Sequence, residues 1–484
     1  MHLNCILLIV AEDFFHEQVS RRYGKCVDHG VSYHLTNRDD LHLLKPFENV
    51  TLDVRLDDEP EILYDDAQIF RTAPTSLRAE SSAPKPFQDL DNRVRLNGVT
   101  RRQPETRIRP PVAEQHERSI ISVLVNYANA GVHYTSELYA HDDLVENTLS
   151  VTGVVERASY QQVSFTDAQT VSVTMPYNAP AAASNGECQF EFMATQANAQ
   201  LASSGVNVDA FTHKEYILPA YVPGCSLGWS GIAYLGYRGY CGIYCISWVR
   251  SSSPTVRAHE LGHSFGLGHS GQHGAQYRDY SSLMGNSQEW RSYSTAERAE
   301  IGWISNAELV QHTGGAAVYT VRDRGLAPTT QLPHAAVIAP CPSCPYPSGG
   351  GTLIISYASG QNDPYDAELR SEYKMHVLVK VLGSWPFDSG QAGTYAYATL
   401  TAGATYSMTE ASVSITACAV GSDTAVVAVE SSTAATPGIC ASAAPATSPP
   451  PSPPPPRPRP PPSPPPPRAP LSPPPPPPRD PPIR

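Results

Sequence analysis

The spacing of apolar residues predicts a mixture of helices and strands between residues 116 and 308. Ser119–Tyr127 is apolar and β-branched, which is typical of a buried strand. Thr255–Phe265 is helical in character and follows Pro254, a residue favoured at the start of a helix. Phe190, Met193, Ala194 and Ala197 recur at helical spacing within Asn185–Ala202. Further strands are predicted at Glu156–Val163, Thr170–Pro176, Tyr216–Val222 and Gly231–Tyr237, and a further helix at Thr295–Ile301. This mixture predicts an α+β domain.

Residues 309–440 carry a different pattern, in which nearly every apolar run is a strand. Gly-rich turns separate these runs, which predicts an antiparallel, sandwich-like β domain. Residues 441–484 are Ser-Pro and poly-Pro runs, which favour polyproline II and cannot pack a core. The predicted strands are Ala317–Val321, Thr352–Tyr357, Lys374–Leu382, Thr394–Thr401 and Ser412–Cys418.

Residues 1–115 form a separate, prosegment-like region with dense charge. Leu3–Ala11 is apolar but has neither a preceding Lys or Arg nor a clear cleavage site. It therefore fits an atypical signal peptide, an incomplete start of the chain, or a buried strand. Arg101-Arg102 and Arg107–Pro111 lie in a basic, proline-rich stretch, which is either a protease-processing site or a plain linker. Asn49-Val50-Thr51 is a candidate glycosylation site.

Composition narrows the classes of function. The 484 residues carry a net charge of −12, and such an acidic chain argues against nucleic acid as the main partner. No run of about 20 apolar residues occurs, so no membrane span is expected. Ten cysteines include the close pairs Cys241/Cys245 and Cys341/Cys344. Because these pairs are far apart and differ in form, disulfides are favoured over a Cys-rich zinc site.

The segment His259–His269, HELGHSFGLGH, matches the pattern HExxHxxGxxH at every specified position. His259 and His263 are four residues apart, so both imidazoles leave one face of a helix, as two ligands of one Zn²⁺ require. Gly266 can adopt a left-handed conformation, end the helix and turn the chain so that His269 supplies a third ligand.

Three protein ligands leave a position for water, which is the catalytic arrangement of zinc. Zinc lowers the pKa of its water towards ~7 and polarises a peptide carbonyl. Glu260, one step round the helix, is placed to act as the general base. His213 and His273 are expected in the core or on the surface rather than at the metal. Asp142, Asp143 and Asp279 are expected to be solvated surface acids, with a supporting role at the site as the alternative.

Asp279–Gly285, DYSSLMG, follows the motif after a short loop. Metzincin metallopeptidases have the same long motif followed by a Met-containing turn beneath the metal, and Met284 occupies that place. Some metzincins carry a Tyr two residues after the Met. Here that position is Asn286, which leaves Tyr280 and Tyr293 as the remaining candidates.

The whole arrangement resembles the gametolysin family of metallopeptidases of green algae, on His259–Gly271, Asp279–Gly285, Thr295–Ile304 and the aromatic-rich Gly228–Val249. The resemblance implies a metzincin-like catalytic domain at 116–308, and a secreted endopeptidase that cleaves hydroxyproline-rich matrix or wall glycoproteins. It implies zinc in preference to copper, since the first motif residue is His259 rather than Gln. It also implies latency through a prosegment, where Cys26 is an available thiol without the matrixin motif.

The tail resembles wall-glycoprotein modules, so we expect it to tether the enzyme to the wall or matrix. One alternative is a wall-associated structural or binding protein with an inactive protease domain. A zinc amidase or another non-peptidase hydrolase is a second alternative, which the third His and the Met turn disfavour.

Overall fold

The computed structural model describes residues 116–442, except 131–133, 135, 181–187, 220, 223–228, 237–238, 240, 286, 345–350, 385–391 and 433–437. Before residue 116 it describes the backbone of six strands. These are β1 His2–Phe14, β2 Val19–Asp28, β3 Val31–Leu35, β4 Asn49–Asp57, β5 Ile69–Thr72 and β6 Arg93–Thr100. Arg101-Arg102, Arg107–Pro111 and the tail lie outside the described residues.

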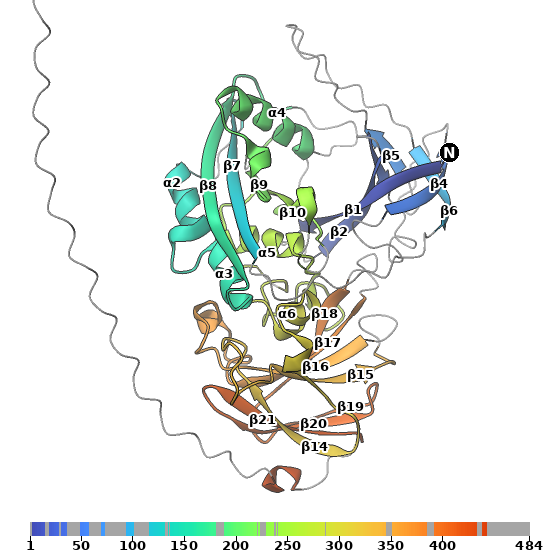
Figure 1. Cartoon of the computed structure of the whole chain (residues 1–484), viewed down its shortest axis with the longest axis vertical. Helices are drawn as coiled ribbons and strands as arrows, with labels where there is room; N and C mark the ends of the chain where they lie inside the picture. Colours follow the sequence, from blue (N-terminus) through green and yellow to red (C-terminus); the bar gives the residue numbers. More distant parts are fainter. Residues whose placement is uncertain are drawn as a thin grey trace, which may run out of the picture. The chain divides into compact units, whose positions relative to one another are not determined.

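The first half of the described chain is a mixed sheet with helices on both faces. Its strands are β7 His116–Tyr127, β8 Val163–Met175, β9 His213–Ile217, β10 Gly231–Tyr234 and β11 Ile246–Val249. They pair in the order β10-β11-β9-β7-β8, and every pairing is parallel except β10 with β11. β1 adds an antiparallel strand at the β10 edge. Figure 1 shows β7 and β8 running side by side.

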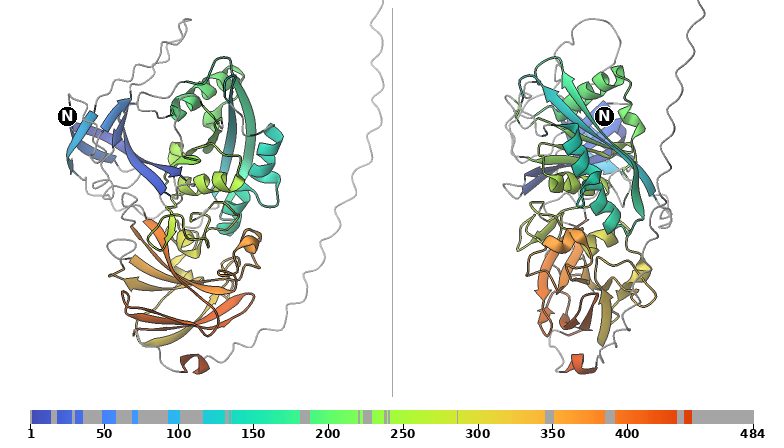
Figure 2. Two further views of the ribbon diagram at one scale, coloured as in Figure 1. Left: turned by 180° about the vertical axis from the view of Figure 1, so that it is seen from behind. Right: turned by 90° about the vertical axis from the view of Figure 1, so that its left-hand side faces the viewer.

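Alternation along β7 sends successive side chains to opposite faces of this sheet. Val123 packs in a cluster with α4, Phe190–Ser203, while Leu124 packs in another with α2, Glu137–His141, and α5, Pro254–Ser264. α3, Val151–Ala158, shares a further cluster with α5. Figure 2 shows α4 and α2 on opposite sides of β7 and β8.

The strand predicted at Glu156–Val163 is wrong for most of its length. α3 covers Val151–Ala158, with the Ser150 side chain accepting a hydrogen bond from Gly153 N at its start. Val151, Val154, Val155 and Ala158 are buried at helical spacing, so burial of one face extends the helix into the segment predicted as a strand.

The later part of the chain forms two sheets around one buried core. The six-stranded sheet has the order β12-β18-β17-β16-β15-β13, and the four-stranded sheet has the order β14-β21-β20-β19. The first sheet is not purely antiparallel, since β12 pairs parallel to β18 and β13 parallel to β15. β12 comes from the segment after the HExxH helix, so residues predicted for two domains share one sheet. Residues 1–443 belong to a single compact unit.

The remaining elements have the following bounds. The strands are β12 Ser270–Gln272, β13 Leu309–Gln311, β14 Ala316–Arg322, β15 Ala336–Cys341, β16 Gly351–Ala358, β17 His376–Ser384, β18 Ala392–Leu400, β19 Thr405–Met408, β20 Val413–Val420 and β21 Thr424–Glu430. α6 covers Thr295–Glu300, and η1, a π-helical turn, covers Asp142–Glu146. The 3-10 turns are η2 Val208–Ala210, η3 Gly242–Tyr244, η4 Asn306–Glu308, η5 Pro364–Glu368 and η6 Ile439–Ser442.

Candidate metal centre

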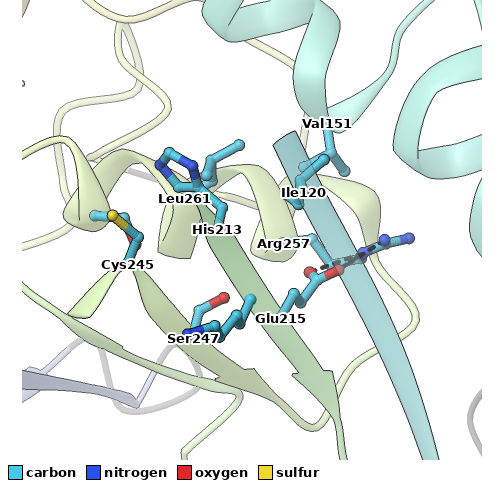
Figure 3. Close-up of a pocket in the computed structure, with 10 residues that line it drawn as sticks. Ile120, Val151, His213, Glu215, Cys245, Ser247, Arg257 and Leu261 are labelled. Atoms are coloured by element: carbon cyan, nitrogen blue, oxygen red, sulfur yellow. Dashed lines mark hydrogen bonds and ion pairs between the residues drawn. The ribbon is translucent and has the colours of Figure 1, made fainter. Parts of the chain in front are cut away.

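Helix α5 carries the first two histidines of the motif and is buried along its whole length after Pro254. An ion pair fixes the face of α5 that lies against strands β7 and β9. The guanidinium of Arg257 contacts the carboxylate of Glu215 on β9 at 2.8 Å, and Ser122 on β7 contacts both groups. Figure 3 shows this pair beside a small cavity behind α5, with room for about one water molecule. The helix therefore cannot rotate without breaking a buried charged network.

His213 lies behind α5 with a different set of neighbours. The centre of its ring lies 5.2 Å from the centre of the Phe265 ring, and its Nε2 lies 3.8 Å from Cys241 Sγ. Cys241 and Cys245 are joined in a disulfide, so their sulfurs are not metal ligands here. Burial, followed by the charge of Arg118, lowers the pKa of His213 to about 3. His213 is thus a neutral core residue, which agrees with the prediction that it lies in the core or on the surface rather than at the metal.

The structure brings the three motif histidines together in the core. His259, His263 and His269 are fully buried, and each offers a ring nitrogen within 4.8 Å of the other two. Nε2 of His263 and Nε2 of His269 are 3.1 Å apart. Two nitrogens bound to one tetrahedral zinc at ~2.1 Å would be roughly 3.4 Å apart, so this spacing suits a shared ion.

Backbone carbonyls set the orientation of the two helical imidazoles. Nδ1 of His259 lies 2.9 Å from Leu283 O, and Nδ1 of His263 lies 2.7 Å from Leu267 O. Because only an N–H can donate to a carbonyl, both rings keep the lone pair of Nε2 for a metal. A set of three imidazoles fits a divalent transition metal such as zinc.

Gly266 provides the turn that delivers His269. Its φ is 94°, a conformation that glycine adopts without the clash that a Cβ would cause. Leu267 N donates to Gly262 O at 3.1 Å, which closes the end of α5. The chain then reverses, and Thr394 N of β18 donates to His269 O at 3.1 Å.

Glu260 lies against the first residue of strand β10. A Cβ built at Gly231 would collide with the Glu260 carboxylate, so the carboxylate occupies space that any other residue at 231 would fill. Glu260 is fully buried, and in the sequence it lies between His259 and His263. Glu260 directly follows His259 on α5, so its side chain leaves the helix one step round from the face that carries the two helical histidines.

Met284 packs directly beneath α5. A Cβ at Gly262 would lie 2.7 Å from Met284 Sδ, so the glycine allows the thioether to approach the helix between the two histidines. The preceding carbonyl, that of Leu283, is the one that orients His259. The turn therefore supports the site through both a side chain and the backbone.

Strand β17 holds the loop between His269 and Met284 with a buried charge pair. Asp279, fully buried, contacts Lys380 Nζ and Ser270 Oγ, and it accepts from Ser281 N at 2.9 Å. Burial would raise the pKa of Asp279, but Lys380 and the hydrogen bonds hold it below its ordinary value. The prediction of a solvated surface acid is wrong for Asp279, because nothing local in the sequence reveals Lys380.

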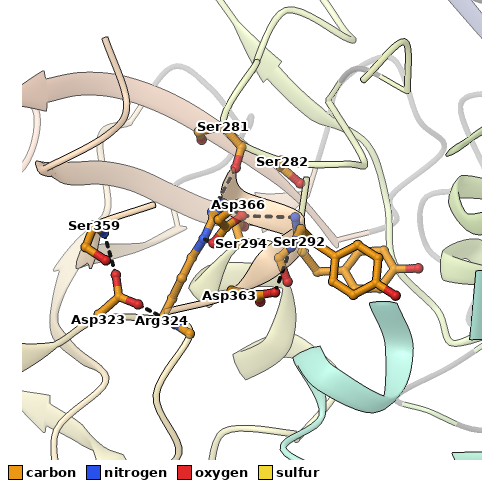
Figure 4. A network of polar contacts seen from close by, with 12 residues as sticks. Ser281, Ser282, Ser292, Ser294, Asp323, Arg324, Ser359, Asp363 and Asp366 are labelled. Carbon is orange, nitrogen blue, oxygen red and sulfur yellow. Dashed lines mark hydrogen bonds and ion pairs between the residues drawn. The ribbon is translucent and has the colours of Figure 1, made fainter. Parts of the chain in front are cut away.

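A second buried network joins the same loop to the later strands (Figure 4). The Arg324 guanidinium contacts both carboxylate oxygens of Asp366, at 2.5 and 2.6 Å, and donates to Ser281 O at 2.8 Å. Ser292 N donates to Asp366 at 3.1 Å. Residues beyond 308 thus hold the backbone on both sides of Met284.

A comparison with protein families gives a match that covers more than half of the chain. The model of the gametolysin peptidase M11 family matches residues 124–406, a range that contains the histidine cluster, Met284 and Lys380. The chain belongs to the gametolysin peptidase family. It is accordingly a metallopeptidase by family, as the resemblance of its motifs predicted. A comparison with individual curated proteins gives no match.

The sequence of this gametolysin-family chain did not reveal one tyrosine at the site. Tyr277 is buried, and its hydroxyl lies 2.9 Å from Nε2 of His269. Tyr293 instead donates to Ala258 O at 2.8 Å, and Tyr280 stacks on Arg370 at 3.8 Å. Tyr277 stands eight residues after the third histidine and has no conspicuous spacing, so only the fold places it.

Several other sequence predictions concern residues outside the histidine cluster. The disulfides Cys241–Cys245, Cys341–Cys344 and Cys418–Cys440 confirm the preference for disulfides over a Cys-rich zinc site. His273 is exposed, and Asp142 and Asp143 are half-buried in η1. Asn49 opens β4 and Cys26 lies in β2, but their side chains are outside the described residues, so both roles stay predictions. No helix in the described part is long and apolar enough to span a membrane.

Proposed function

We propose that this gametolysin-family protein is a secreted, zinc-dependent endopeptidase of the metzincin type. Its substrates would be hydroxyproline-rich glycoproteins of an extracellular matrix or cell wall, and the tail would tether it there. The observation that carries the proposal is the convergence of His259, His263 and His269, with Glu260 next to His259 on the same buried helix. The substrate class and the location rest on the family resemblance and on the tail composition.

His259, His263 and His269 would hold the ion, which supplies a Lewis acid and lowers the pKa of water to about 7. Glu260 takes the proton of the attacking water at a carboxylate oxygen and returns it to the leaving amine. Gly231, the first residue of β10, leaves room for the carboxylate, and Met284 with Leu283 O supports the helix-borne ligands. Hydrolysis by this route needs no covalent intermediate between the substrate and the protein.

The substitution Glu260→Ala tests the assignment. The variant is expected to keep one zinc per chain by elemental analysis and to lose roughly 10²–10⁴-fold in the rate of casein hydrolysis. Zymography of the parent with and without a chelator separates an active enzyme from a wall-associated protein with an inactive domain. Equal cleavage by parent and variant would refute the role of Glu260, and absence of bound metal would refute the site.

Removal of residues 441–484 tests the tether separately. The shortened protein should appear in the medium rather than on the wall. Unchanged retention on the wall would remove the tail from the proposal and leave the peptidase assignment intact.

A further inference from the structure

Tyr277 occupies a position that the family motif does not define. Its side chain is 1% exposed, and its hydroxyl reaches the same nitrogen, His269 Nε2, that lies 3.1 Å from His263 Nε2. The Tyr277 ring is also 4.3 Å from the His269 ring and 6.0 Å from the His259 ring, centre to centre. Four buried side chains therefore converge on one point.

The backbone around Tyr277 is built to hold that position. Tyr277 has a φ of 59°, which a bulky residue adopts at an energetic cost, and His273 and Gly274 before it also have positive φ. Gly274 N donates to the Tyr395 hydroxyl of β18 at 2.5 Å, and Asp279 anchors the following residues to Lys380. The strained conformation persists because contacts on both sides fix it.

A bound ion changes what the hydroxyl can do. The lone pair of His269 Nε2 can serve either the Tyr277 hydroxyl or a metal ion, but not both. Once the ion takes that lone pair, the hydroxyl stands beside the ion with no hydrogen bond to that nitrogen. Its 2.9 Å distance from Nε2 is an ordinary hydrogen-bond length, and it is within about 0.5 Å of the roughly 3.4 Å expected between two ligands that share an ion.

We infer that Tyr277 is an additional protein ligand of the metal in the resting enzyme, beside the position that the three histidines leave for water, an inference that rests on the proposed metal site. On coordination the phenol O–H bond breaks, its proton passes to water, and the phenolate oxygen supplies the electron pair to the ion. The other two tyrosines near the motif do not compete for this role, since Tyr293 donates to a helix carbonyl and Tyr280 stacks on Arg370.

Copper provides the test, because Cu²⁺ binds imidazole sites and is coloured, whereas zinc is spectroscopically silent. The full chain is stripped of metal and titrated with Cu²⁺ while its visible absorption is recorded. The parent should show a phenolate-to-copper charge-transfer band. Tyr277→Phe should lose that band while it retains the weaker bands of copper bound to histidine. Tyr280→Phe, a matched change three residues away, should leave the spectrum unchanged.

Competition with a chelator gives a second readout with zinc itself. The zinc dissociation constant of Tyr277→Phe should rise about 10-fold to 100-fold relative to the parent, and that of Tyr280→Phe should not change. Copper binding without the charge-transfer band in the parent would overturn the ligand role of Tyr277 alone. A parent chain that binds neither metal would overturn the proposed metal site as well.

Discussion

Two segments build the candidate metal centre by different means, helix α5 and the loop from Ser270 to Gly285. Helix α5 places His259 and His263 through local geometry, since a spacing of four residues is enough. The loop places Tyr277 and Met284 through contacts with residues about a hundred positions later, above all Asp279 with Lys380. One segment can be recognised in the sequence, while the other is specified by tertiary structure.

This difference gives the strands after residue 308 a role at the metal centre. Asp279 and Lys380 lie on opposite sides of the boundary predicted at residue 308, and so do Ser270 and Thr394, which pair in one sheet. The family match also continues to residue 406. The strands β17 and β18 thus belong to the support of the site, and the loop depends on them more than the helix does.

Lys380→Met should have the largest effect, and it should fall on the loop. The change leaves the Asp279 carboxylate buried without its cation, which costs about 3–5 kcal/mol of unfolding free energy. The zinc dissociation constant should rise too, because His269 and Tyr277 lose their anchored loop. Urea unfolding and chelator competition measure the two effects.

A double-mutant cycle provides the control for Lys380. Asp279→Asn combined with Lys380→Met removes both charges and should recover part of the stability that Lys380→Met loses. If the two single changes add without recovery, the pair does not couple and the anchoring argument is wrong.

Gly231→Ala should affect the helix side instead. The added methyl group would collide with the Glu260 carboxylate and displace the base from its position. We expect kcat to fall on the order of 10²-fold, since general-base catalysis contributes about that much or more. The zinc content should not change, because none of the three histidines is touched.

Gly421→Ala is a matched control for Gly231, since the nearest atom to its added Cβ is Thr424 O at 3.6 Å. It should leave kcat unchanged. A loss of zinc from Gly231→Ala would mean that β10 supports the metal ligands rather than the base.

The candidate site illustrates what one sequence can reveal. His259, Glu260, His263 and His269 follow from motif spacing, and Gly266 follows from the need for a left-handed turn. Asp279 was misjudged because its partner Lys380 is 101 residues away, and a charged residue read alone is usually exposed. Tyr277 was missed because its position depends on a loop with several positive φ angles, which only the fold determines.

The same limit applies to the fold. Long periodic segments were found: β7 ends at Tyr127 as predicted, and α4 ends within one residue of the predicted end but begins five residues later, at Phe190. Glu156, Arg157 and Ala158 were assigned to a strand, whereas burial of one face against α5 makes them the end of a helix. The short strand β12 has no apolar pattern that a sequence could reveal. Its pairing with β18 is what makes it a strand.

Acid should distinguish the two segments by the pH at which each loses stability. Behind α5, the pKa of His213 is lowered to about 3 from 6.5, so the unfolded chain binds more protons between those values. Stability should therefore fall by about 1.4 kcal/mol per unit as pH drops through that window. In the loop, the pKa of Asp279 is lowered below 3.8, so its contribution is lost only at still lower pH. As pH falls, the contribution of His213 behind α5 should therefore be lost before that of Asp279 in the loop.

His213→Gln isolates this smaller effect, because the difference from the parent cancels protons taken up by the metal ligands. The difference in unfolding free energy should be constant above pH 6.5 and should then shift in favour of the variant as pH falls. Urea unfolding at a series of pH values gives the difference directly. A difference that stays constant down to pH 4 would mean that His213 accepts a proton in the folded protein, and the neutral core assigned behind α5 would be wrong.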